Sequence, residues 1–183
     1  QFLVAHDHAS GADRAHREFG LSGHADLADH QYVQRCAQGS GHLDRHGSMK
    51  NYAAVKSRIF ARQGAGDTAI CGIDDPWCAA IADGIHSGAA LRRVSVLHYL
   101  ANGISAPDGL LRDVRNGKET ARIDLAGMPA LKGAHNWQNA CMAYGAARAL
   151  GLTVQEIENA MRNFPGLAHR MQEVGRVNGI PFI

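Results

Sequence analysis

The sequence predicts an α/β fold in which helices and strands alternate and a small β-meander follows. Residues 48–62 carry apolar side chains at helical spacing, and residues 67–73 (DTAICGI) form a short apolar run of strand character. Asp75-Pro76 then supplies the N-cap and first position of a second helix, residues 76–86. With 45% hydrophobic and 20% charged residues, the chain has the composition of a globular protein.

Composition excludes several classes of protein. A net charge of +2 with scattered basic residues gives no nucleic-acid-binding pattern, and no apolar run is long enough for a membrane span. The first ten residues lack the features of a signal peptide, and the absence of an initial Met suggests a fragment. The four cysteines form no C-x-x-C pair, which favours buried thiols in a reducing, cytoplasmic setting.

Residues 1–41 form an atypical segment, with neither the period of a helix nor that of a strand. A metal-binding tract is one interpretation of its histidines, although their spacing matches no known ligand set. These histidines are His6, His8, His16, His24 and His30. We expect this segment to be disordered or foreign to the fold.

The segment from His42 to Phe60 begins with a His/Asp/Arg/His cluster and continues as an amphipathic helix. Lys56 lies in the middle of the apolar stripe, where a charged amine is costly. One interpretation is a lysine whose stem packs while its ammonium reaches water. The other is a desolvated, neutral amine, which can act as a nucleophile or take up carbon dioxide to give a metal-ligating carbamate. His42 could supply an imidazole nitrogen to the same site.

Turn signals predict the next elements. Residues 91–97 are strand-like, and residues 101–124 contain short strands with a hairpin turn at Asn116-Gly117. A long Ala-rich helix is expected over residues 135–150. Gly151 follows it directly and marks its C-terminal end.

Cap and turn signals also predict the last elements. Thr153 and Glu156 have the spacing of a capping box for a helix over residues 154–163. A Phe-Pro-Gly linker follows, and residues 171–177 and 180–183 are expected to pair as a hairpin around an Asn-Gly turn.

Two asparagines near the start of the long helix are candidate ligand-binding residues. Asn136 and Asn139 are three positions apart, so they face the same way. A carboxamide offers a donor and an acceptor, which matches the edge of adenine. The alternatives are helix capping by Asn136 and an ordinary buried amide at Asn139.

His169-Arg170 follows the linker and is a candidate phosphate-binding pair. Arginine has a fixed charge and five donors, which suits phosphate recognition from a hinge loop. The alternative is a solvated surface arginine.

Four long motifs, taken together, resemble one family: HLDRHGSMKNYAAVKSRIF, GIDDPWC, LKGAHNWQNACMAYGAARALGL and FPGLAHRMQEVGRV. In this order and spacing, residues 42–183 resemble the Mur ligases of bacterial peptidoglycan synthesis, in particular those that add D-glutamate to UDP-N-acetylmuramoyl-L-alanine. The resemblance implies the second half of a P-loop ATPase-like central domain over residues 42–163. Residues 164–183 would then be a linker and the first strands of a Rossmann-like C-terminal domain.

The resemblance also implies a chemistry. A cytoplasmic, monomeric bacterial enzyme would use ATP and Mg²⁺ to convert the substrate carboxylate into an acyl phosphate. The amine of D-glutamate would attack it, giving an amide, ADP and phosphate. The family's motif positions imply roles for six residues: His42 and a carbamylated Lys56 as metal ligands, Asn136, Asn139, His169 and Arg170 as nucleotide-binding residues, and Lys56 and Arg170 as catalytic residues.

The sequence departs from the family pattern ahead of His42. No G-x-x-x-x-G-K-[ST] phosphate loop occurs, and residues 1–41 lack the Glu-x-Ser-Ser-like stretch that would carry a magnesium-binding glutamate. An out-of-frame or misassembled start would produce such a break between Gly41 and His42. We therefore expect this chain alone neither to bind ATP well nor to catalyse the reaction.

Two alternatives remain open. Another Mur ligase or a folylpolyglutamate synthase-like ligase shares the same domain plan. A degenerate, non-catalytic nucleotide-binding remnant is favoured by the missing phosphate loop.

Overall fold

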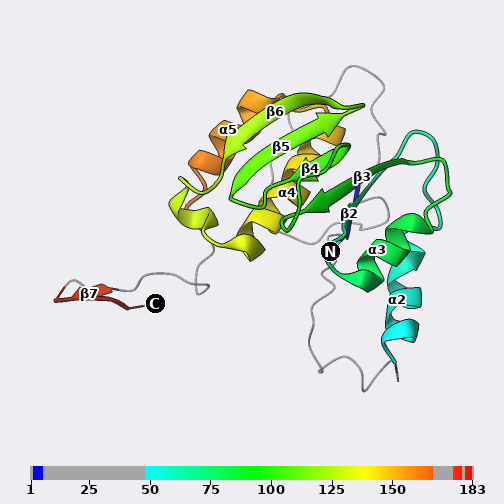
Figure 1. The fold of residues 1–183 in the computed structure, drawn as a ribbon, viewed down its shortest axis with the longest axis horizontal. Helices are drawn as coiled ribbons and strands as arrows, with labels where there is room; N and C mark the ends of the chain where they lie inside the picture. Colours follow the sequence, from blue (N-terminus) through cyan, green and yellow to red (C-terminus); the bar gives the residue numbers. More distant parts are fainter. Residues whose placement is uncertain (1, 6–47, 167–174, 179, 183) are drawn as a thin grey trace, which may run out of the picture.

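A six-stranded mixed sheet is the centre of the fold (Figure 1). The computed structural model describes residues 2–5, 48–166, 175–178 and 180–182. The strands, in their spatial order, are β1 Phe2–Ala5, β2 Thr68–Gly72, β3 Ala90–Ser95, β4 Gly103–Ser105, β5 Leu110–Arg115 and β6 Lys118–Asp124. β2, β3 and β4 run parallel, whereas β1 and the β4–β5–β6 meander pair antiparallel. A second, two-stranded sheet pairs β7 Gly175–Val177 with β8 Ile180–Phe182.

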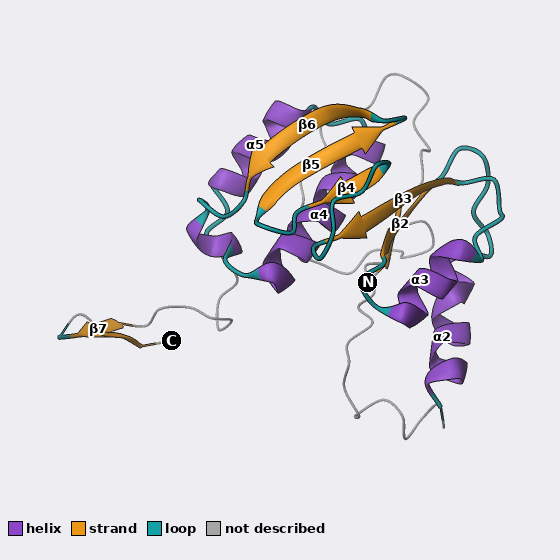
Figure 2. Ribbon diagram, in the orientation of Figure 1, coloured by secondary structure: helices purple, strands orange, loops and turns teal. Residues whose placement is uncertain are grey.

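Helices cover both faces of the parallel strands (Figure 2). The helical elements are α2 Met49–Ser57, η2 Arg58–Phe60, α3 Pro76–Asp83, η3 Pro129–Leu131, α4 Ala134–Ala149 and α5 Val154–Arg162. Successive side chains of a strand point to opposite faces. On β2, Ile70 accordingly joins the larger core beneath α4, whereas Ala69 and Cys71 join a smaller core with α3 and η2. The mixed α/β architecture therefore agrees with the sequence prediction.

Small residues let α4 approach the sheet closely. Gly145 lies on its buried face, where an added Cβ would come within 3.0 Å of Ile104 Cδ1 and 3.2 Å of Ile70 Cγ2. Cys141 and Tyr144 on the same face are fully buried. The Ala-rich sequence of this helix thus reflects a short distance between helix and sheet as well as helix propensity.

The predicted caps and turns are confirmed. Asp75 accepts hydrogen bonds from the first turn of α3, and Pro76 begins that helix. Thr153 and Glu156 form the reciprocal capping box at the start of α5. Asn116 has a φ of 50° at the β5–β6 turn, as a tight hairpin requires.

The structure differs from the sequence prediction in several places. The helix expected over residues 48–62 is α-helical only over Met49–Ser57 and continues as the short helix η2. α3 ends at Asp83, because Gly84 closes the last turn with bonds back to residues 80–82. β3 ends at Ser95, whose hydroxyl accepts from the next backbone N–H groups and turns the chain. β1 was not predicted at all, because its pairing with β2 is a tertiary contact. The predicted residues 171–174 of the last hairpin lie outside the described part of the chain.

Candidate functional site

Lys56 lies near the end of α2 on the stripe that the sequence predicts. Tyr52 and Phe60 on this stripe are buried, whereas Lys56 itself is only partly buried. Its Nζ lies 5.2 Å from the centroid of the Tyr52 ring, which is a cation–π distance. This geometry agrees with a packed stem and a partly exposed amine. Carbamylation of Lys56 stays a prediction.

Asn136 and Asn139 share one face of α4, as predicted. Both are partly buried, and Ala143 on the same face is exposed, so this face points away from the sheet. Asn136 Nδ2 donates to the Lys132 carbonyl at 2.8 Å. The N-cap of α4 is Gly133, with a φ of 91°. Asn136 therefore does not cap the helix, and its side chain stabilises the preceding turn through the bond to Lys132.

Two residues between these asparagines attach α4 to the rest of the fold. The Trp137 ring packs against the turn at Gly109, where an added Cβ would come within 2.8 Å of it. Gln138 Nε2 donates to Asp74 Oδ2 at 3.2 Å. Trp137 and Gln138 therefore hold the first turns of α4 from two directions.

Asp74 lies at the carboxyl edge of the parallel strands and gathers several donors. Ser95 Oγ donates to Asp74 Oδ1 at 2.5 Å, and Val96 N donates to Asp74 Oδ2 at 2.7 Å. Ser95 Oγ in turn accepts from Leu97 N at 3.2 Å and His98 N at 3.0 Å. The carboxyl edge of parallel strands is where open α/β folds bind ligands.

The sequence motifs alone do not indicate Asp74 or Gln138 as part of the site. A signal for Asp74 exists, because it comes two residues after a strand whose last four residues are buried and directly precedes the N-cap Asp75. Gln138 gives no such signal, since a glutamine between two asparagines resembles any polar helix position.

A buried carboxylate fixes the other side of the core. Asp113 on β5 is fully buried and pairs with Arg92 of β3. It also accepts from Tyr144 Oη at 3.2 Å and Arg115 Nε at 3.4 Å. Burial lowers the pKa of Arg92, and burial together with the Asp113 charge raises the pKa of Tyr144. This network joins β3, β5 and α4.

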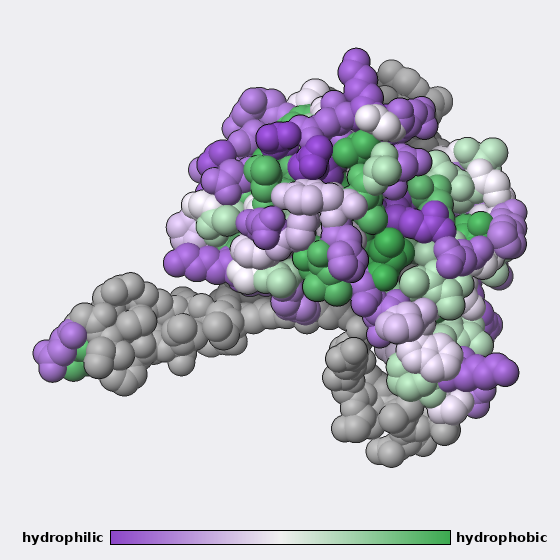
Figure 3. All heavy atoms as spheres, viewed as in Figure 1, coloured by the Kyte–Doolittle hydropathy of each residue, from purple (hydrophilic) through white to green (hydrophobic). Residues whose placement is uncertain are grey.

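The β5–β6 surface carries a set of mutually paired charges, and Figure 3 shows hydrophilic residues gathered over these strands. Glu119 accepts from Arg112 Nε at 2.5 Å and Arg122 Nε at 2.8 Å, which together lower its pKa to about 2. Arg112 also lies 4.9 Å from the centroid of the Tyr99 ring.

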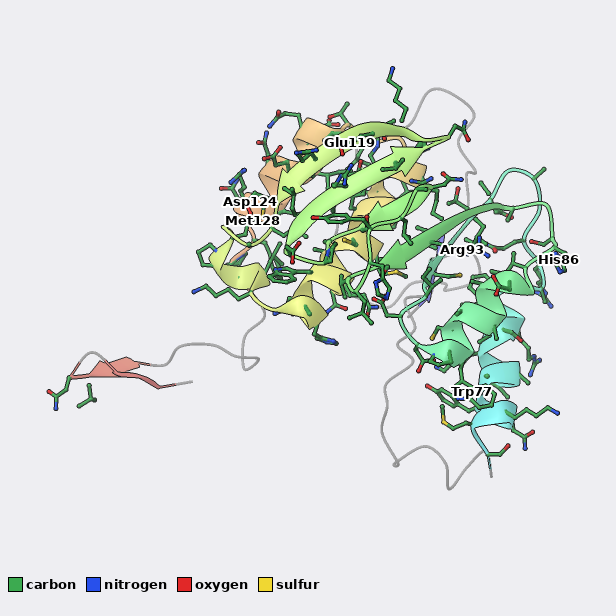
Figure 4. All side chains as sticks on the ribbon, viewed as in Figure 1. Trp77, His86, Arg93, Glu119, Asp124 and Met128 are labelled. Atoms are coloured by element: carbon green, nitrogen blue, oxygen red, sulfur yellow. The ribbon has the colours of Figure 1, made fainter. Side chains whose placement is uncertain are left out.

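An open hollow of about 330 Å³ lies on the same surface. Glu119, which helps to line it, lies on β6, away from Trp77 on the α2–α3 side (Figure 4). Neither Lys56 nor the two asparagines line this hollow. Because the charged side chains that line this hollow already pair with one another, we do not consider it a ligand-binding site.

The structure does not bring all predicted site residues together. Lys56 comes from the α2–α3 side of the parallel strands, whereas Asn136 and Asn139 come from α4 on the opposite face. His42, His169 and Arg170 lie outside the described residues.

Two kinds of feature are absent from the described residues. Residues 48–166 and the short described segments contain no group of three or more His, Cys, Asp or Glu side chains that could hold a metal ion. None of the helices in this part of the chain is long and apolar enough to cross a membrane.

Several curated sequences that are similar to this chain share one name. Three bacterial proteins called "UDP-N-acetylmuramoylalanine--D-glutamate ligase" align with 78% of it. The protein from Caulobacter sp. (strain K31) is 45% identical over 146 residues, or 31% of its own length. The proteins from Brucella abortus (strain 2308) and Paramagnetospirillum magneticum are 46% and 47% identical, each over 30% of its length. The chain therefore spans about a third of the length of these relatives.

Solved structures show the same fold. MurF from Acinetobacter baumannii superposes on 75% of this chain and 30% of its own, with a TM-score of 0.56 and 20% sequence identity. A second structure from that organism, titled as a UDP-N-acetylmuramoylalanyl-D-glutamyl-2,6-diaminopimelate--D-alanyl-D-alanyl ligase, gives a TM-score of 0.54. This likeness supports the mixed α/β architecture.

A family assignment follows from the sequence match and agrees with the fold. Residues 37–147 match the Mur ligase middle domain. The match begins slightly ahead of His42, where the sequence motifs place the start of the central domain. The match includes α2, the parallel strands, the meander and most of α4. The chain belongs to the Mur ligase family.

Proposed function

We propose that this chain is part of a ligase that adds D-glutamate to UDP-N-acetylmuramoyl-L-alanine, and that α4 contributes its adenine site. The identity of 44–47% to relatives with that name is the observation that carries this proposal. Asn136 and Asn139 support it, because two partly buried carboxamides share a helix face that points away from the core. A carboxamide can pair with both the donor and the acceptor on the edge of adenine.

The proposed metal ligands are His42 and a carbamylated Lys56. The amine of Lys56 is partly exposed at the end of α2, so carbon dioxide can reach it. The cationic side chain first loses one proton to become a neutral amine. Addition of carbon dioxide to that amine forms an N–C bond and releases a second proton, which gives an anion with two oxygen donors. Oxygen donors suit Mg²⁺, which would neutralise phosphate charge when bound.

The proposed reaction needs ATP and two further substrates. The substrate carboxylate takes the γ-phosphoryl group of ATP, so ADP leaves and an acyl phosphate forms. The D-glutamate nitrogen then attacks the carbonyl carbon, and as the amide forms the nitrogen loses a proton and phosphate leaves. Arg170, with His169 beside it, would hold the transferred phosphoryl group through charge-assisted hydrogen bonds. Asn136 and Asn139 would orient the nucleotide.

The adenine site can be tested in the chain itself. Adenosine contains the base without the phosphates, so its binding does not depend on a phosphate loop. We expect adenosine to shift the NMR signals of the α4 amides, and Asn139→Ala to weaken its binding by about tenfold, the size of one or two lost hydrogen bonds. Asn102→Ala, at an exposed loop asparagine, is the matched control and should bind like the wild type. Equal binding by both variants would refute the adenine assignment.

The proposal also predicts no ligase activity for the 183-residue chain by itself, because its sequence contains no phosphate-loop pattern. ADP formation should be absent when ATP, Mg²⁺ and both substrates are supplied. ADP that appears only with both substrates present would contradict this prediction.

A further inference from the structure

We infer that Asp74 and Gln138 act as positioning residues that set the rotation of α4 and hence the direction of the Asn136 and Asn139 carboxamides. The inference rests on the proposed adenine site. Its basis is the hydrogen bond from Gln138 Nε2 to Asp74 Oδ2, which at 3.2 Å joins the α4 face beside Asn139 to the carboxyl edge of β2.

Asp74 is itself held firmly. Its two oxygens accept from Ser95 Oγ at 2.5 Å and Val96 N at 2.7 Å, and both donors belong to the end of β3. The carboxylate is therefore fixed to two neighbouring strands before it accepts the bond from Gln138. Because this acceptor is rigid, its bond to Gln138 holds α4 in a fixed position relative to the edge of the sheet.

Gln138 is the polar member of a two-point attachment. Its neighbour Trp137 packs against the Gly109 turn, where the ring leaves no space for a Cβ. Successive helix residues differ by about 100° in direction, so the two contacts restrain rotation about the helix axis. An apolar contact alone tolerates small rotations, whereas a hydrogen bond is directional. Asn136 and Asn139 flank these two residues, so a rotation of α4 would displace both carboxamides.

Two variants remove the contact in different ways. Gln138→Met keeps an unbranched side chain of similar length but has no donor. Asp74→Asn replaces one carboxylate oxygen with an amide nitrogen, which must face an N–H or O–H donor. For each variant we expect adenosine to bind about tenfold more weakly, with a urea midpoint close to that of the wild type for Gln138→Met. Asp75→Asn is the control, because asparagine is an equally good N-cap for α3.

A pH profile separates positioning from simple loss of stability. Gln138→Glu keeps the shape of the side chain but places two carboxylates together, which raises the pKa of the pair. Adenosine binding by this variant should be weak at pH 8 and recover at about pH 5, where a shared proton restores a donor to Asp74. The wild type should show a flat profile. The thiol of Cys141 is a titratable group near Asp74, and burial together with that carboxylate raises its pKa, so it stays neutral over this range.

The outcomes are distinct. If the wild type does not bind adenosine, the proposed adenine site fails and this inference falls with it. If the wild type binds adenosine, and both Gln138→Met and Gln138→Glu bind it as tightly as the wild type at every pH, only the positioning inference is overturned. Weaker binding by Gln138→Met together with recovery of Gln138→Glu at low pH supports it.

Discussion

Tyr144 Oη donates to Asp113 Oδ2 at 3.2 Å inside the core and so joins α4 to β5. Both side chains are fully buried, and Arg92 holds the other carboxylate oxygen. A buried carboxylate is costly unless hydrogen bonds and an opposite charge compensate it. The network therefore explains how an aspartate is accommodated in the centre of a β-strand.

Tyr144→Phe should destabilise the fold. The substitution removes one hydrogen bond to a buried carboxylate and leaves the ring in place, so we expect the free energy of unfolding to fall by about 1–3 kcal/mol. Urea denaturation followed by circular dichroism measures the change. Tyr99→Phe is the control, because Tyr99 is exposed and its ring contact with Arg112 does not need the hydroxyl. Similar losses in both variants would contradict a specific role for the Asp113 bond.

Gly109→Ala should destabilise the fold more than Gly117→Ala. Both glycines have a φ of +75°, so alanine is strained at either position by about 1–2 kcal/mol. At Gly109 the added methyl group would also come within 2.8 Å of the Trp137 ring, whereas at Gly117 nothing lies within 4 Å. The clash should add about 1–3 kcal/mol and shift the tryptophan fluorescence. Equal unfolding free energies would show that the packing of Trp137 is loose.

Glu119 should make stability depend on acidic pH. Its arginine partners lower its pKa from 4.5 to about 2, so its contribution is complete above pH 4.5 and is lost as the pH falls towards 2. Glu119→Gln should therefore unfold at lower urea concentration than the wild type at pH 7, and the difference should shrink between pH 4.5 and 2. A difference that stays constant over that range would mean that the ion pairs contribute nothing.

Lys56 should take up carbon dioxide if the proposed metal site is correct. With ¹³C-labelled bicarbonate at alkaline pH, where more of the amine is neutral, a carbamate signal should appear in the ¹³C NMR spectrum and grow when Mg²⁺ is added. Lys56→Arg should abolish this signal, whereas Lys50→Arg, at an exposed lysine of the same helix, should retain it. A signal that survives in Lys56→Arg would place the carbamate elsewhere.

Local signals in the sequence determined much of the fold. The Asp75 N-cap, the Thr153–Glu156 capping box and the Asn116 turn depend on contacts within a few residues, which a sequence pattern contains completely. The asparagine pair on α4 also follows from helical spacing. The motifs that resemble the Mur ligases lie at fixed positions in the chain, so the family could be predicted before the fold was known.

Only the tertiary structure decided which distant residues meet. Strand β1 exists through its pairing with β2, and the hydrogen bond between Asp74 and Gln138 joins a loop and a helix that are far apart in the chain. The sequence leaves open whether Lys56 is a desolvated amine or a lysine whose ammonium reaches water, and the packing of α2 leaves it partly exposed above Tyr52. Such outcomes depend on how elements pack, and a helix or strand pattern carries no information about its partner across the fold.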